Sequence, residues 1–168
     1  QVATGNAVLS SLGPATNRVL RKGDAFAVEI SPQFEGYRTV LGRTYTIGNT
    51  GPEEKGLSSR VAFTHRRICE SIVPGIGACD IARTAEDLLE NAGLMKYTCR
   101  GLGHGVGLDP EESPRLDLND STVVEPGMAF AVRTSVICPG VGGAFFADTV
   151  LVAEDKGITL SELPENYT

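Results

Sequence analysis

The stretch Gly101-Leu-Gly-His104-Gly-Val-Gly107-Leu-Asp109-Pro-Glu111-Glu112-Ser-Pro114 decides how the chain is interpreted. One of only two histidines stands here among four glycines, and a pair of carboxylates begins seven residues after it. Glycine lets the backbone approach a ligand or a second strand closely. A histidine in such a place can be a metal ligand or an acid/base near neutral pH. The alternative is a glycine-rich turn whose imidazole is hydrogen-bonded and structural.

The composition is that of one soluble globular domain. The 168 residues are 41% hydrophobic, with a net charge of −6 and a pI near 4.9. This acidic balance gives no basic surface for nucleic acid or an anionic membrane, and no apolar run reaches the roughly 18 residues that span a bilayer. The four cysteines are widely spaced, so we expect reduced thiols in a cytoplasmic protein and no cysteine-based zinc site. Because residues 1–5 resemble neither a signal peptide nor an initiator context, we expect a processed piece of a longer protein.

Strand-like runs flank the middle of the chain. Residues 25–30 form a short run with aromatic and β-branched side chains, and residues 37–47 alternate as one strand of an antiparallel hairpin. Residues 128–138 and 144–153 are two further strand-like runs, joined by a glycine-rich turn. These four runs predict a largely antiparallel sheet.

Between these runs the period changes to that of helices. Leu57, Val61, Ile68 and Ile72 share one stripe, and a second helix follows with Ile81, Ala85, Leu88, Leu89 and Ala92 inward. His65 lies near the first stripe without an acid at useful spacing, so we interpret it as structural. The order of elements predicts an α+β domain, residues 1–168, with helices on one face of the sheet.

Several short motifs resemble those of the pita-bread-fold peptidases, which include methionine aminopeptidase, aminopeptidase P, prolidase and creatinase. The motifs follow the family's order and spacing over nearly the whole chain: Lys22-Gly-Asp24, Gly36-Tyr37, Arg43-Thr44, Pro74-Gly75, Gly103-His104-Gly105, Glu112, Pro126-Gly127-Met128 and Asp148-Thr-Val-Leu-Val152. The contexts of Arg18, Thr64–Arg67 and Gly77–Ile81 are most similar to the creatinase branch. The resemblance implies a curved sheet with helices on its outer face. It also implies a leading helix pair that nothing before Gln1 supplies, so we expect a domain truncated at its N-terminus.

The resemblance also implies where a catalytic dinuclear metal centre would lie. The family holds two divalent ions with two aspartates, one histidine and two glutamates, and these positions fall on Glu29, Val40, His104, Arg133 and Ala147. Only the histidine is kept outright, and Glu29 is a longer substitute for aspartate. We therefore expect the metal site to be dismantled, with no metal and no other cofactor.

Creatinase, which works without metal, offers a second template. Its histidine position falls on Leu12, its two substrate-orienting glutamates on Gly42 and Arg133, and its second histidine on Glu111. The catalytic residues of creatinase are therefore missing as well. A guanidinium substrate would also meet the like charge of Arg133.

Arg133 is expected to take the place of the metal charge. A buried arginine needs carboxylate partners, because an unpaired buried charge costs several kcal/mol. We predict that Arg133 pairs with Glu29, with Glu111, or with both. Such a pair could stabilise a relic cavity, or Arg133 and His104 could bind an anionic ligand such as a carboxylate.

Two classes of function follow. In the first, the protein is a metal-independent hydrolase of a C–N bond in a small carboxylated amide or peptide-like substrate. His104 would be the acid/base, Arg133 and Glu112 would bind the substrate, and Glu29 or Glu111 would handle the second proton. In the second, the protein is an inactive pseudopeptidase kept for binding or assembly. A third possibility is that another segment or subunit supplies the missing groups. The missing helices would leave apolar sheet surface uncovered, so we expect a homodimer or a missing segment to cover it.

Overall fold

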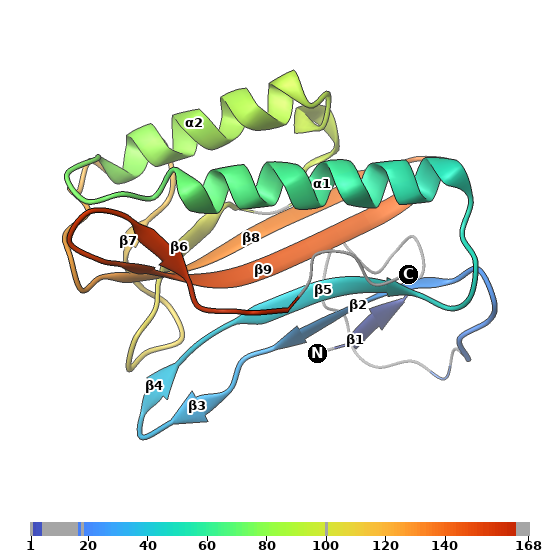
Figure 1. Ribbon diagram of the computed structural model, residues 1–168, viewed down its shortest axis with the longest axis horizontal. Coiled ribbons are helices and arrows are strands. Elements are labelled where there is room, and N and C mark those ends of the chain that lie inside the picture. Colours follow the sequence, from blue (N-terminus) through green and yellow to red (C-terminus); the bar gives the residue numbers. More distant parts are fainter. Residues whose placement is uncertain (1, 5–16, 18, 100, 164–168) are drawn as a thin grey trace.

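The computed structural model describes residues 2–4, 17, 19–99 and 101–163, and Leu12 lies outside them. Two layers make up the molecule: a sheet, and two helices that lie along one of its faces (Figure 1). The helices are α1 (Pro52–Glu70) and α2 (Ala78–Asn91), followed by a short 3-10 turn η1 (Met95–Tyr97). The α+β prediction is therefore confirmed.

The main sheet is antiparallel at every described strand pair. Its strands lie in the order β1 (Val2–Thr4), β2 (Ala25–Ile30), β5 (Leu41–Thr46), β9 (Gly142–Val152), β8 (Ala129–Cys138), β6 (Gly103–Gly105) and β7 (Glu112–Arg115), with β10 (Gly157–Thr159) paired to β9. A separate hairpin joins β3 (Gln33–Phe34) to β4 (Tyr37–Arg38).

The prediction of one continuous strand over 37–47 was wrong. The structure divides it into β4 and β5, with a break at residues 39–40. The backbone N–H of Val40 donates to Thr149 Oγ1 at 2.8 Å, and that hydroxyl donates to the Val40 carbonyl at 3.1 Å. A side chain of β9 thus satisfies the Val40 backbone that a neighbouring strand would otherwise bind.

The residues at the two ends of helix α1 are typical of helix termini. Pro52 occupies its first turn together with two acidic residues, which suit the positive end of a helix, and Arg67 lies in its last turn. The predicted stripe of Leu57, Val61 and Ile68 is buried and packs mainly on β9, while α2 packs on α1. In the described part of the chain, neither helix combines the length and apolar character needed to cross a bilayer.

The two faces of the sheet carry different cores. On the helical face, alternate residues of β8 and β9 such as Phe130, Val132 and Phe146 join the helices in one large cluster. The opposite face, which we call the open face, carries a smaller apolar cluster. Its members are Ala27, Val40, Val106, Ala131, Phe145 and Ala147. The candidate site lies on this open face.

Candidate functional site

Strand register aligns four residues in a row across the sheet. Glu29 of β2 is opposite Gly42 of β5, Gly42 is opposite Ala147 of β9, and Ala147 is opposite Arg133 of β8. Three strand spacings separate the backbones of the outer two residues, about 14 Å in all. The two central residues have no side chain beyond a methyl group. The long side chains of Glu29 and Arg133 can therefore meet above them.

An ion pair connects the two outer residues of this row, Arg133 and Glu29. Arg133 Nε lies 3.1 Å from Glu29 Oε2, and Arg133 Nη2 lies 3.3 Å from Glu29 Oε1, so the guanidinium binds the carboxylate side-on. The side chains are 17% and 11% exposed, respectively. Charge-assisted, two-point bonds of this kind are stronger and more directional than single neutral ones. The predicted pairing of Arg133 with Glu29 is confirmed.

His104 is the third member of the cluster. It lies on β6 opposite Ala131, and its Nε2 is 2.9 Å from Arg133 Nη1. A guanidinium can only donate, so Nε2 accepts this bond. The Nδ1–H then donates to the carbonyl of Gly105 at 2.9 Å. Both ring nitrogens of the buried imidazole are thus engaged, and these bonds require its neutral form.

The glycines around His104 have a packing role. A Cβ on Gly103 would collide with the carbonyl oxygen of Ala131, and a Cβ on Gly105 would lie 2.7 Å from that of Ser113. Strands β8 and β7 therefore approach β6 too closely for any side chain at these positions. Strand packing thus accounts for the two glycines that flank His104, and the histidine itself contacts the ion pair.

Apolar residues surround the cluster. Val40 is 3% exposed and Ala147 is fully buried, and both belong to the apolar cluster of the open face. Neither side chain offers a ligand atom. An ion pair in such surroundings is screened less by water than one on the surface.

The structure does not bring Glu111 and Glu112 to Arg133 as partners. Glu111 is exposed and instead pairs with Arg115, Oε2 to Nη2, at 3.0 Å. Glu112 Oε1 accepts the backbone N–H of Asp109 at 2.9 Å and so closes the turn after β6. Of the five predicted site residues, three form one cluster: Glu29, His104 and Arg133.

A second buried polar cluster lies on the helical face. His65 of α1 lies between Thr134 Oγ1, 2.9 Å from its Nδ1, and Asp148 Oδ2, 3.1 Å from its Nε2. Arg43 Nη1 is 3.0 Å from the same carboxylate, which also accepts the hydroxyl of Ser161. Burial raises the pKa of Asp148, but the hydrogen bonds from His65, Arg43 and Ser161 outweigh it and hold that pKa below its ordinary value.

The absence of an acid partner for His65, inferred from spacing along α1, was therefore wrong. Asp148 is 83 residues further along the chain, and only the packing of α1 on β9 brings the two together. The structural interpretation of His65 fits its 3% exposure.

Comparison with known proteins identifies relatives of this chain in sequence and in structure. The chain is 34% identical over 150 residues to a protein named probable dipeptidase PepE from Mycobacterium bovis, covering 89% of this chain and 40% of that protein. It is 28% identical to the Xaa-Pro dipeptidase of Pyrococcus furiosus, covering 96% and 47% of the two chains. The crystal structure of dipeptidase PepE from Mycobacterium ulcerans matches with a TM-score of 0.90 and 30% identity, over 98% and 44%.

The chain spans less than half the length of each of these relatives. Its architecture is the pita-bread fold that the motifs predicted. The model of metallopeptidase family M24 matches residues 2–154, nearly the whole chain. The chain therefore belongs to metallopeptidase family M24.

Proposed function

We propose that this domain is a non-hydrolytic member of its family, a pseudopeptidase that binds a carboxylated or peptide-like ligand on its open face. The observation that carries the proposal is the cluster of Arg133, Glu29 and His104. A permanent cation supplied by the chain stands where the family resemblance places a glutamate ligand. It binds the two remaining side chains that could serve as metal ligands.

The residues present do not fit a dinuclear metal centre. Val40 and Ala147 provide no donor atom at two of the five positions. Arg133 would repel a divalent ion, and the lone pair of His104 Nε2 already accepts a hydrogen bond from its guanidinium. In the described ranges, no three His, Cys, Asp or Glu side chains converge as a metal site would require.

The state of His104 also weighs against hydrolysis. A general base needs a lone pair directed at the proton it removes. The Nε2 lone pair of His104 is directed at Arg133, and Nδ1 carries the hydrogen that is bonded to Gly105. While these bonds hold, the imidazole has no free position with which to accept a proton from water.

The cluster can still bind an anion. The side chain of Arg133 is 17% exposed, and its contacts with Glu29 and His104 use three of its five N–H groups. A ligand carboxylate, such as the C-terminus of a peptide, is the chemical group that matches the rest. The apolar residues of the open face would contact the remainder of that ligand.

The test combines metal analysis with reconstruction of the missing ligands. We expect the purified protein to contain no stoichiometric manganese, cobalt, iron or zinc, and to cleave no Xaa-Pro dipeptide when these ions are added. A variant with Glu29→Asp, Val40→Asp, Arg133→Glu and Ala147→Glu should gain a metal-dependent rise in Tm. Two equivalents of tightly bound metal in the unmodified protein, or metal-dependent cleavage by it, would overturn the proposal.

A metal-independent hydrolase is the second candidate, favoured by the incomplete burial of the cluster. A substrate carboxylate that displaced Glu29 from Arg133 would leave Glu29 as a proton acceptor beside His104. One experiment separates the two candidates. A panel of N-acyl amino acids and dipeptides is incubated with the protein in the presence of a chelator, and mass spectrometry then detects any cleavage. Turnover that disappears in Glu29→Gln would establish the hydrolase, and unchanged substrates with measurable binding would support the pseudopeptidase.

A further inference from the structure

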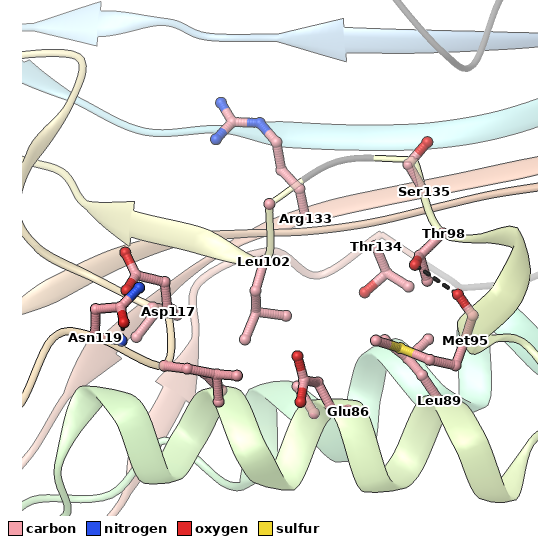
Figure 2. Close-up of a pocket in the computed structure, with 15 residues that line it drawn as sticks. Glu86, Leu89, Met95, Thr98, Leu102, Asp117, Asn119, Arg133, Thr134 and Ser135 are labelled. Carbon is pink, nitrogen blue, oxygen red and sulfur yellow. Dashed lines mark hydrogen bonds between the residues drawn. The ribbon is translucent and has the colours of Figure 1, made fainter.

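A hollow lies on the helical face, apart from the ion-pair cluster. It has a volume of about 340 Å³ and lies between α2, β8, η1 and the segment 116–119. Figure 2 shows that the side chain of Arg133 points away from α2 and from this space, so only its strand borders the hollow. The volume falls within the range of roughly 300–1,000 Å³ of sites that hold small molecules.

The walls of this α2 hollow are mainly apolar. Leu89 and Ala85 come from α2, Met95 from η1, and Leu102 and Leu116 from the chain on either side of β6 and β7. Figure 2 shows Leu102 above the helix, with Met95 and Leu89 to one side. Such walls favour an aliphatic or aromatic group, because its burial removes apolar surface from water.

Glu86 brings a negative charge into these apolar surroundings. Its side chain rises from α2 into the hollow (Figure 2), and no described residue forms a hydrogen bond or an ion pair with it. Asp117 and Asn119 add a second carboxylate and an amide at one end. Among the described residues of the lining, Arg133 is the only cationic one, and its guanidinium is bound to Glu29 on the other face.

This arrangement defines the chemical class of the ligand. A carboxylate beside apolar walls is best satisfied by a cation that donates hydrogen bonds, since ionic contacts strengthen as water is excluded. An anion would be repelled by Glu86 and Asp117, and a purely apolar molecule would leave Glu86 partly desolvated without compensation. We propose that the α2 hollow is a binding site for a small primary amine with an apolar arm. This site is independent of the function proposed for the open face.

The probe for this site is 2-phenylethylamine, titrated by calorimetry into the whole chain at neutral pH. Its matched comparisons are 2-phenylethanol, which lacks the charge, and 3-phenylpropionate, which reverses it. We expect the amine to bind at least tenfold more tightly than either. Binding should shift the NMR signals of the Leu89, Leu102 and Leu116 methyl groups and leave those of Val40 and Val106 unchanged.

Substitution of the carboxylate locates the charge contact. Glu86→Gln should weaken amine binding about tenfold and leave the weak binding of 2-phenylethanol unchanged. Glu90→Gln, an exposed glutamate one turn further along α2 and outside the hollow, should not alter it. Equal loss in both variants, equal affinity for the amine and the alcohol, or no binding at millimolar concentration would overturn the proposal.

Discussion

Arg133 Nε lies 3.1 Å from Glu29 Oε2, although two whole strands, β5 and β9, separate the backbones of these residues. Gly42 and Ala147 make this contact possible, because they occupy the same row and have almost no side chain. The ion pair therefore connects β8 directly to β2 across the open face. It joins the half of the sheet that carries the helices to the half that does not.

This ion pair should be strongly coupled. Arg133→Met leaves Glu29 without the guanidinium in apolar surroundings, and Glu29→Gln leaves the guanidinium of Arg133 without that carboxylate charge. Each substitution should therefore cost about 2–4 kcal/mol of unfolding free energy. The double variant should cost much less than the sum of the two. Urea denaturation of the four proteins measures this coupling.

The exposed pair of Arg115 and Glu111 is the matched control, since its side chains are 67% and 58% exposed. The same cycle with Arg115→Met and Glu111→Gln should give a coupling of about 0–1 kcal/mol. Similar coupling energies in the two cycles would mean that burial adds nothing to the Arg133–Glu29 contact.

Gly42 is expected to tolerate no side chain. A Cβ there would collide with the ring of Phe145 and lie 2.9 Å from the Cβ of Ala147. Gly42→Ala should therefore lower the unfolding free energy by about 1–3 kcal/mol through overpacking. Gly56→Ala is the control, because this exposed glycine of α1 has open space around it and alanine should stabilise the helix by about 0.5–1 kcal/mol. Thermal unfolding of both variants would contradict this expectation if their Tm values moved in the same direction.

Local sequence patterns were enough to predict most elements. The stripe of α1 predicted a helix at the right place, because its periodicity reflects which face is buried. The apolar run 25–30 predicted a strand correctly from its length and its aromatic and β-branched residues. The alternation over 37–47 failed as a single strand, since Thr149 from a distant strand captures the backbone of Val40. Periodicity contains no information about such a side chain.

The candidate site was predictable only in part, and for a definite reason. The family's motif spacing brought Glu29, His104 and Arg133 to one place, and the structure gives the same cluster. Glu111 was a second candidate partner because spacing alone cannot show that a nearer cation, Arg115, binds it. The contact of His65 with Asp148 depends entirely on how α1 packs on the sheet.

The buried carboxylate of Asp148 should make stability depend on acid pH. Its native pKa lies below the ordinary 3.8, so the native state favours the ionised form more than the unfolded chain does. The resulting stabilisation is complete above that ordinary value and is lost as the pH falls through it toward the native pKa. We expect the carboxyl carbon signal of Asp148 in NMR titrations to change at a lower pH than that of an unperturbed aspartate. Urea denaturation should show stability falling below about pH 4.

Asp148→Asn tests the same carboxylate by substitution. The variant leaves the buried guanidinium of Arg43 without its counter-charge, so it should lose about 3–5 kcal/mol at neutral pH. Its stability should also depend less on pH below about pH 4, because the titrating group is gone. If the stability of this variant still fell with acid as in the unmodified protein, other carboxylates would be the cause of that fall.

The helical-face side of β2 and β5 is expected to form the contact between two copies of the chain. Register places Phe26, Val28 and Ile30 on the same side as Tyr45 and Arg43, and the rings of Phe26 and Tyr45 stack at 5.5 Å. Figure 1 shows the helices over β8 and β9, with β1 and β2 to one side of them. Neither helix makes more than marginal contact with β2 in the described residues, and Ile30 is 55% exposed. Apolar surface of this kind favours association.

Light scattering coupled to size-exclusion chromatography measures this association directly. The unmodified chain should elute as a dimer, and Ile30→Glu should weaken the dimer at least about tenfold, because it places a charge within an apolar contact. Phe63→Glu is the matched control, since Phe63 is 56% exposed but lies on α1, away from β2. Its dimer should be unchanged. A monomeric unmodified chain at high micromolar concentration, or equal weakening by both substitutions, would contradict the assignment of this surface.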